Sequence, residues 1–360
     1  MAAGGHRILD VVEINPYAPR PHAFTESALC LRDAIRRAGW DSEHRFNQRD
    51  AARPCIVMGA VPPRLDAVAA FDPATTVIFN FEQLGTGSYN DHSPFIDWLR
   101  RWPVVADYHS ANIEWLARRG IDAVELPIVP SLGIAWRPDL AHEPVNDVVF
   151  FGTPNPRRER LVGELREAGL TVEWVVGAFG EELAPALKRA RIVLNVHFYE
   201  AALFPIARFL QAIALGLPCV CEDSVFSRRT GAAKSGIVFA PYGELVDACR
   251  DVLADPASWP ARVDAMRRWA GRIEFAGALE TVSRRLQSAP SAAPGEERLT
   301  NDEIERLLLE DESALPPEGE HVQPFKLVER TPGKGRYGVW IVVLMLVFSF
   351  YTIWVSMVQR

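Results

Sequence analysis

Short apolar runs alternate with amphipathic stretches along most of the first 286 residues. The runs end in polar residues, and the stretches between them carry apolar side chains three and four positions apart, as helices do. Strands are expected at residues 7–14, 55–60, 76–81, 104–107, 123–126, 147–151, 171–176, 192–196, 219–221 and 236–240. Helices are expected at residues 23–38, 64–71, 94–101, 111–119, 157–168, 181–189, 206–214, 244–253, 259–270 and 273–286. Strands that alternate with helices predict mostly parallel sheets covered by helices on both faces.

Residues 191–223 show the clearest unit of this kind. A short strand ends close to the polar residues His197 and Glu200, and an amphipathic helix follows it. That helix is stopped by Gly216 and Pro218, after which a second strand begins. Because ligands of such sheets bind beyond the carboxyl ends of the strands, the polar residues of this unit are candidates for a site.

The pattern divides the chain into two α/β domains and a different C-terminal part. A proline-rich stretch without a clear period separates two sets of alternating strands and helices, and a second change of composition follows the last helix. The expected parts are a first Rossmann-like domain at 1–126, a connection at 127–146, a second Rossmann-like domain at 147–286, an acidic proline-rich linker at 287–336 and a hydrophobic tail at 337–360.

The tail contains twenty uncharged residues at 339–358, enough for a helix that crosses a hydrocarbon core of about 30 Å. A buried helix packed on the rest of the protein is the alternative. Four basic residues precede the run and Arg360 follows it, so the positive-inside rule predicts a single-pass anchor with the globular part in the cytoplasm. No signal peptide is expected at the N-terminus.

Within the linker, residues 300–310 are expected to form a short helix. Thr300 and Glu303 make a capping box, and Ile304 lies on an apolar face. Residues 300–309 of this helix could dock on a protein partner or on the body of the protein. The alternative is an ordinary helical turn in a linker.

Charge and cysteine content exclude several classes of protein. The formal net charge is −7, but residues 295–320 hold ten acids and two bases, which leaves 37 bases and 36 acids in the rest of the chain. A nearly neutral body gives no reason to expect a nucleic-acid partner. The five cysteines are odd in number, form no C-x-x-C pair and lie mostly in apolar runs, so reduced core thiols are expected.

Three segments of the second domain resemble glycosyltransferases with the GT-B fold, especially the spore-maturation-like group of single-chain transferases. They are VVFFGTPNPRRERLVGEL, RIVLNVHFYEAALFPIARFLQAIALGLPCVCED and SGIVFAPYGELVDACRDVLADP. The first domain resembles the same group more loosely, through VIFNFEQL and DYHSANIEWLARRG. The resemblance implies two facing doubly wound domains, in which the second holds a nucleotide-sugar and the first holds the acceptor.

The resemblance also implies where the donor would bind. The family pattern of two glutamates eight positions apart falls on Leu203 and Gln211 here, while Glu200 lies eight residues before Arg208, a spacing of the spore-maturation-like group. Arg208 suits a phosphate oxygen, and Gln211 can bond a ribose hydroxyl. A surface ion pair is the alternative for Glu200 and Arg208.

Further donor contacts are expected at the ends of two strands. Gly152 and Thr153 precede a helix whose first turn carries Arg157 and Arg158, so free N–H groups and positive charge would both favour a diphosphate. A solvated basic helix face is the alternative for these arginines. His197 is expected to contact phosphate or sugar, or to be a satisfied, partly buried histidine.

An inverting transferase requires a base that deprotonates the acceptor hydroxyl, and the first domain contains three candidates. Glu82 and His109 follow strands directly and should face the cleft, and His22 ends the proline-rich loop after the first strand. Hydrogen bonding that fixes the loops is the alternative role of all three.

The expected function is metal-independent transfer of a hexose from a nucleoside diphosphate sugar to a hydroxyl acceptor, with a lipid-linked or cell-envelope glycan as a possible acceptor. No Asp-x-Asp pair and no His/Cys cluster with metal-ligand spacing occurs in residues 7–285. An inactive GT-B-like binding or scaffold protein and a nucleotide-sugar epimerase are the alternatives.

Overall fold

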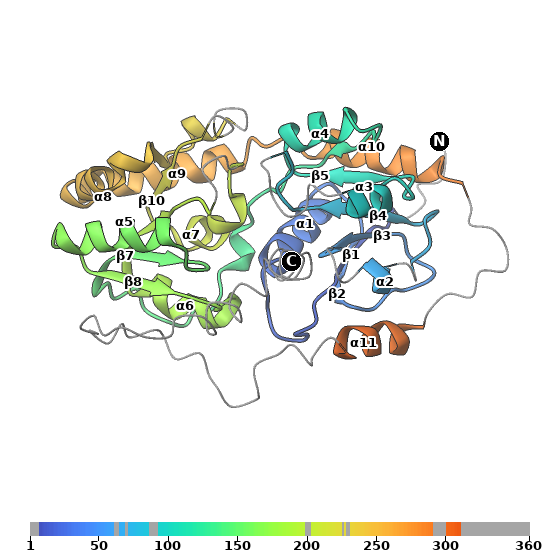
Figure 1. The fold of residues 1–360 in the computed structure, drawn as a ribbon, viewed down its shortest axis with the longest axis horizontal. Coiled ribbons are helices and arrows are strands. Elements are labelled where there is room, and N and C mark those ends of the chain that lie inside the picture. The colour runs from blue at the N-terminus through green and yellow to red at the C-terminus, as the bar shows by residue number, and fades with distance from the viewer. Residues whose placement is uncertain are drawn as a thin grey trace, which may run out of the picture.

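The computed structural model describes residues 7–60, 65–68, 71–85, 93–198, 203–224, 227, 231–290 and 300–310. Two α/β lobes lie side by side, as Figure 1 shows. Each lobe is built on one parallel sheet. The predicted α/β class with two Rossmann-like sheets agrees with this arrangement.

The first lobe contains a six-stranded sheet with the order β2-β1-β3-β4-β5-β6. Its strands are β1 (Asp10–Glu13), β2 (His44–Phe46), β3 (Cys55–Met58), β4 (Thr76–Asn80), β5 (Val105–Asp107) and β6 (Val124–Glu125). Both faces are buried, because Val11 packs into one core cluster and Val12 into another. The first cluster contains α1 (Thr25–Arg37), and the second contains α2 (Leu65–Val68), α3 (Ser93–Leu99) and α4 (Ser110–Ala117).

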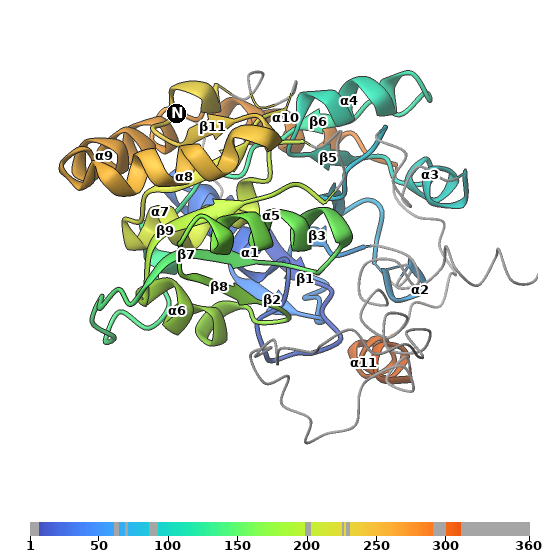
Figure 2. The same ribbon diagram turned by 60° about the vertical axis from the view of Figure 1, so that its left-hand side comes forward.

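The second lobe contains a five-stranded sheet with the order β11-β10-β9-β7-β8. Its strands are β7 (Asn146–Phe151), β8 (Val172–Val175), β9 (Ala190–Asn195), β10 (Cys219–Glu222) and β11 (Val238–Ala240). The helices α5 (Pro156–Glu167) and α8 (Leu245–Ala254) cover one face (Figure 2). The other face packs with α6 (Gly180–Lys188), α7 (Leu210–Leu215) and α9 (Trp259–Ala270).

The two lobes share one continuous core. The cluster that packs α1 on the first sheet also includes Leu183 of α6, Ile213 of α7 and Met266 of α9. After α9 the chain returns to the first lobe, where α10 (Ala276–Gln287) packs against β4 and β6. The sequence pattern groups this helix with the second domain, whereas in the structure it packs on β4 and β6 of the first sheet, with Leu279 and Val282 in the shared core.

Two local predictions differ from the structure. The strand β2 is not predicted, because its sequence HRF lacks an apolar run and is only partly buried. The helix expected from residue 206 is divided into a 3-10 turn at Ile206–Arg208 and the α-helix α7. Gly216 ends α7 with a φ of +76°, as predicted from its position before Pro218.

The helix α11 (Asn301–Glu310) docks on the first lobe against α2. Ile304 is fully buried in the second core cluster, and the Asn301 amide exchanges two hydrogen bonds with the backbone of Arg49, at 3.1 and 3.2 Å. Thr300 and Glu303 form the predicted capping box. The alternative in which this helix docks on the body of the protein is therefore the one observed.

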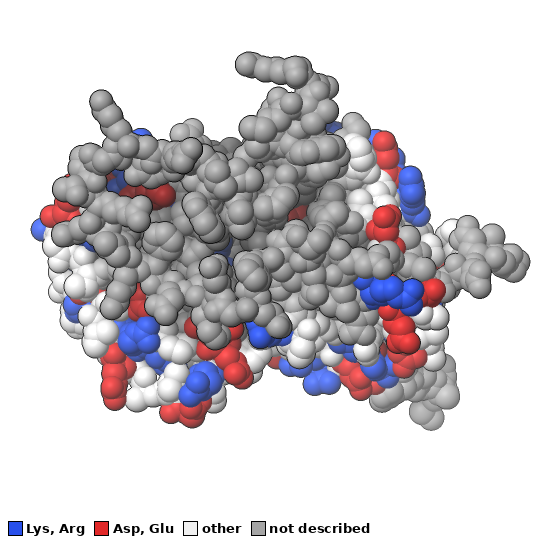
Figure 3. Space-filling view, turned by 60° about the horizontal axis from the view of Figure 1, so that its bottom comes forward, with Lys and Arg blue, Asp and Glu red and all other residues white. Residues whose placement is uncertain are grey.

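The expected membrane span at 339–358 lies outside the described residues, as does most of the linker. Among the helices that the structure describes, none is long and apolar enough to span a bilayer. The five cysteines are free and buried, as predicted. On the face seen in Figure 3, acidic and basic side chains of the described residues are intermixed.

Candidate functional site

Arg208 reaches from the turn before α7 to the carboxyl end of β7. Its Nη1 donates to the Phe151 carbonyl at 2.5 Å, and its guanidinium lies 5.3 Å from the centre of the Phe151 ring. The guanidinium also fills the space beside Gly152, whose φ is +136°. A Cβ on Gly152 would lie 2.7 and 2.9 Å from the two terminal nitrogens of Arg208. The glycine therefore makes room for the arginine.

Arg208 is a partly buried cation without a carboxylate partner among the described residues. Burial lowers its pKa to about 10, which leaves it protonated at neutral pH. Its side chain has five N–H donors, and the hydrogen bond to Phe151 uses Nη1 alone. A cation with further donors at the end of a parallel strand is suited to an anionic ligand.

Arg158 holds together the ends of two strands. It is 3% exposed and donates to the carbonyls of Val196 and Thr153, at 2.8 Å each. Burial, and then the charges of Arg208 and Arg157, lower its pKa to about 9. Its guanidinium is thus committed to the protein, and it contributes positive charge to the site rather than free donors.

Arg157 is paired with Glu222 at the end of β10. Its Nη1 donates to Oε2 of Glu222 at 2.7 Å, and the guanidinium stacks 3.9 Å above the Tyr242 ring. The same carboxylate accepts from the backbone N–H of His197 at 2.9 Å. Glu222 is not among the predicted site residues, although its place at the end of a strand is visible in the sequence.

His197 is 2% exposed and lies at the end of β9. Burial lowers its pKa, so the ring is neutral at pH 7. Its Nε2 is buried and has no hydrogen-bond partner among the described residues. An unpaired buried ring nitrogen is costly unless a water molecule or a ligand satisfies it.

Gln211 faces the first lobe instead of the arginines. Its Nε2 donates to Oε1 of Glu26 in α1 at 2.7 Å, and the same oxygen accepts from the backbone N–H of Gly180 at 2.9 Å. Burial raises the pKa of Glu26. This contact bridges the lobes at the N-termini of α1 and α6, and no sequence pattern pairs residues so far apart.

Asp107 organises the carboxyl end of the first sheet. It is fully buried and accepts from the amides of Asn80 and Asn112, at 2.6 and 2.9 Å, and from the backbone N–H of His109 at 2.8 Å. Burial raises its pKa to about 8 although these donors oppose the shift. The same two amides donate to the Glu82 carbonyl, which fixes the backbone of that residue.

The three predicted base candidates occupy different positions. His109 caps α4 by accepting the Ala111 N–H on Nδ1 at 3.1 Å, which places the proton of the neutral ring on Nε2. His109 is therefore arranged as a donor. His22 stacks on Tyr17 with 4.6 Å between the ring centres, and the Phe179 ring lies tilted against it at 4.8 Å. Glu82 is partly buried beside this network.

The structure brings most of the predicted donor residues together. Gly152, Thr153, Arg157, Arg158, His197 and Arg208 surround the carboxyl ends of β7 and β9. Gln211 lies one turn away and is bonded across the lobes. Glu200 lies outside the described residues. No group of described His, Cys, Asp and Glu side chains could hold a metal ion.

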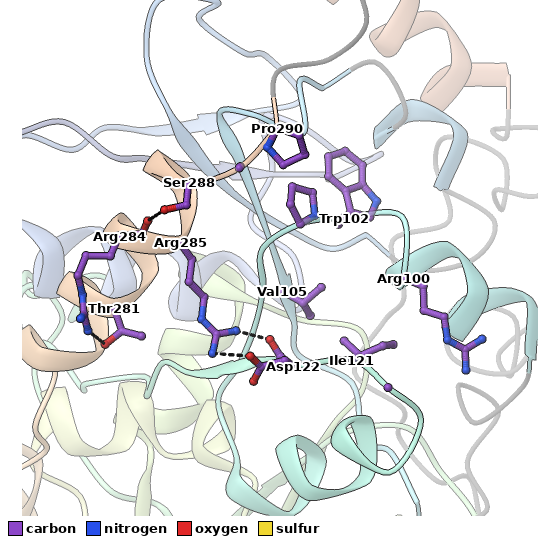
Figure 4. A pocket seen from close by; sticks show the side chains of 13 residues that line it. Arg100, Trp102, Val105, Ile121, Asp122, Thr281, Arg284, Arg285, Ser288 and Pro290 are labelled. Carbon is purple, nitrogen blue, oxygen red and sulfur yellow. Dashed lines mark hydrogen bonds and ion pairs between the residues drawn. The ribbon is translucent and has the colours of Figure 1, made fainter.

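Two cavities differ in their setting. One, of about 760 Å³, lies between β5, α10 and the end of α4. Figure 4 shows that Arg100 and Arg284 in its wall point away from Arg285, which is bonded to Asp122. Its charges do not converge on a ligand. The other cavity, of about 400 Å³, lies between the lobes and includes His109.

No family model matches this chain. Two uncharacterized proteins of Acanthamoeba polyphaga mimivirus are similar in sequence. One is 31% identical over 103 residues, which cover 28% of this chain and 12% of that protein; the other is 25% identical over 186 residues, which cover 49% and 62%. The chain thus spans less than two thirds of either relative.

Several solved structures are also similar. They include sucrose-phosphate synthase from Thermosynechococcus elongatus, with 14% identity, a TM-score of 0.48 and coverage of 78% of this chain and 99% of that one. AviGT4, a glycosyltransferase of avilamycin A biosynthesis, has 15% identity, a TM-score of 0.49 and coverage of 78% and 98%. Anabaena Alr3699/HepE in complex with UDP has 10% identity, a TM-score of 0.48 and coverage of 78% and 100%.

Proposed function

We propose that this chain is a glycosyltransferase that takes a sugar from a nucleoside diphosphate sugar and transfers it to a hydroxyl acceptor. The observation that carries the proposal is the site around Arg208, where three guanidinium groups gather at the end of β7 and Glu222 is the carboxylate that partners one of them. A diphosphate would supply the missing negative charge. The resemblance of the sequence segments in this lobe to GT-B glycosyltransferases supports the same assignment.

Each residue of the site would have a task in this reaction. Arg208, which is partly buried and protonated at neutral pH, would stabilise the charge that develops on the departing diphosphate. The neutral ring of His197 would satisfy its Nε2 on the donor. The first turn of α5 would add its N–H groups, since Asn155 caps the helix and holds the Arg158 N–H at 2.8 Å.

Glu82 is the base that we propose for the acceptor hydroxyl. Its backbone is fixed by two side-chain amides, whereas His109 is held as a donor and His22 lies between the Tyr17 and Phe179 rings. No step of this scheme uses a metal ion. The hydrophobic run at 339–358 would tether the enzyme to the cytoplasmic face of a membrane, where a lipid-linked or cell-envelope glycan is the acceptor that we favour.

Nucleotide binding tests the donor assignment. UDP, GDP, ADP and TDP should be compared by thermal shift, because a ligand that binds the folded state raises its stability by mass action. At least one should stabilise the wild type, and Arg208→Ala should abolish the effect. Arg160→Ala is the matched control, since Arg160 is exposed on the same helix as Arg157 and Arg158. If no nucleotide stabilises the wild type, or if Arg208→Ala responds fully, the proposal is wrong.

A binding protein without transferase activity is the second candidate. Its supporting observation is the commitment of His109 as a helix cap, which removes one of the expected bases. Nucleotide-sugar consumption separates the two functions: a transferase releases nucleoside diphosphate from the donor, and a binding protein does not. An epimerase would convert the donor sugar with no acceptor present.

A further inference from the structure

The cavity between the lobes has a floor and a rim of different character. Its floor is formed by buried side chains, among them Ile128, Phe204 and Ile206, which are 3%, 2% and 5% exposed. Its rim carries three exposed charged residues, Glu125, Arg272 and Glu274. A volume of about 400 Å³ lies within the range of roughly 300–1,000 Å³ that is usual for small-molecule sites.

Aromatic rings form a large part of the wall. Trp269 is partly exposed and stands edge-on to Phe204, with 5.9 Å between the ring centres. Tyr108 lines the cavity from the opposite lobe. Such rings offer flat apolar surface to a ligand. Next to them, the rim carboxylates can accept hydrogen bonds from hydroxyl groups. A ligand with an apolar face and a hydroxyl edge matches both surfaces.

Charge separates this cavity from the arginine site. The rim carries two carboxylates and one guanidinium, so its formal charge is negative, whereas three arginines gather at the end of β7. An anionic group in the cavity would face two carboxylates and one guanidinium, a net negative rim that disfavours it. The cavity and the arginine site are nevertheless close along the chain, because Ile206 of the cavity floor belongs to the same 3-10 turn as Arg208.

We propose that the cavity between the lobes binds the acceptor as an uncharged sugar ring, which stacks on Trp269 and bonds Glu274 and Glu125 through its hydroxyl groups. This inference rests on the proposed function, for which it names the acceptor class. It excludes acceptors whose reacting sugar carries a phosphate. His109, which lines the same cavity and holds a proton on Nε2, would donate to a ring or hydroxyl oxygen of the acceptor.

Direct binding of simple sugars tests the inference without any donor. Saturation-transfer NMR on the full chain should detect at least one of the methyl glycosides of glucose, galactose, mannose and N-acetylglucosamine. Glucose 6-phosphate should bind more weakly than methyl glucoside. Trp269→Ala should weaken glycoside binding roughly fivefold or more, through the loss of ring stacking.

Because Trp269 also packs on Phe204, Trp269→Ala could weaken binding by disturbing the fold, and two milder variants are therefore needed. Trp269→Phe keeps an aromatic ring, and Glu274→Gln changes an exposed charge; both should weaken glycoside binding in folded protein. Glu167→Gln, an exposed change on α5, is the matched control and should leave it unchanged.

The outcomes separate this inference from the proposed function. If none of the four glycosides binds, if the phosphorylated sugar binds best, or if the Trp269 and Glu274 variants bind like the control, the inference is overturned even where UDP still stabilises the protein. If glycosides bind as expected but no nucleotide does, the cavity is a sugar site and the transferase proposal fails instead.

Discussion

Replacing Gly152 by alanine is expected to disable the arginine site without touching any charged residue. The φ of Gly152 is +136°, a conformation that alanine rarely adopts. The added Cβ would lie 2.7 Å from Nη1 of Arg208 and 2.9 Å from Nη2, closer than real Cβ atoms come to other heavy atoms. Because the obstructing group is the end of a flexible side chain, the guanidinium should move and lose its bond to the Phe151 carbonyl.

The two effects have different sizes and different observables. Backbone strain at such a position is worth about 1–3 kcal/mol and lowers the free energy of unfolding. Displacement of Arg208 removes a charged hydrogen bond to the ligand, which is worth about 1.5–3 kcal/mol and weakens nucleotide binding roughly 10- to 150-fold. The second effect is the one that concerns function.

Gly177→Ala is the control that separates strain from displacement. Gly177 also has a positive φ, +73°, but no atom lies within 4 Å of the place that a Cβ would take there. Urea unfolding should show that both variants lose stability, while calorimetry with the nucleotide that binds the wild type should show weaker binding for Gly152→Ala alone. Equal affinities of the two variants for that nucleotide would refute the role given to Arg208.

Three further predictions concern stability. Burial raises the pKa of Asp107 to about 8 in the folded state, so the stability that its protonated form contributes is fully present below about pH 4 and is lost as the pH rises through 8. Between pH 5 and 8 the urea midpoint of the wild type should therefore fall with pH, and Asp107→Asn should make this dependence flatter. An equal pH dependence in the variant would contradict this prediction. Glu26→Ala leaves the Gln211 amide unpaired and should lower the free energy of unfolding by about 1–3 kcal/mol, more than Glu26→Gln does, as urea titration can show. Ile304→Ala should increase hydrogen exchange in α11, whereas the exposed Arg306→Ala should not; equal exchange would mean that burial of Ile304 does not hold the helix.

The two sheets were predictable because their strands are buried on both faces. Such strands appear in the sequence as short apolar runs, and cysteines within these runs are predicted to be buried. Cys55 and Cys219 are buried in the structure. The exception is β2 at the edge of the first sheet. Its residues pair with β1 through the backbone, and their polar side chains show no periodic signal.

The grouping of site residues was predictable to the extent that it follows from strand ends. Parallel strands bring their carboxyl ends to one edge, so Gly152 and His197 had to lie near each other. Partners across the lobes were not predictable in this way. Glu26 meets Gly180 and Gln211, which are 154 and 185 residues away, and only the packing of α1 on α6 and α7 brings them together.

The same limit applies to the charge of the arginine site. In the sequence, Arg157 and Arg158 are equivalent neighbours on a helix, and Arg208 is a distant third. In the structure, Glu222 neutralises Arg157, while Arg158 and Arg208 have no carboxylate partner among the described residues. One buried and one partly buried cation in excess at one strand end cost free energy unless an anion pairs with them. A ligand with about two negative charges would remove that cost, and for this reason we expect a diphosphate to bind there in preference to a neutral or singly charged molecule.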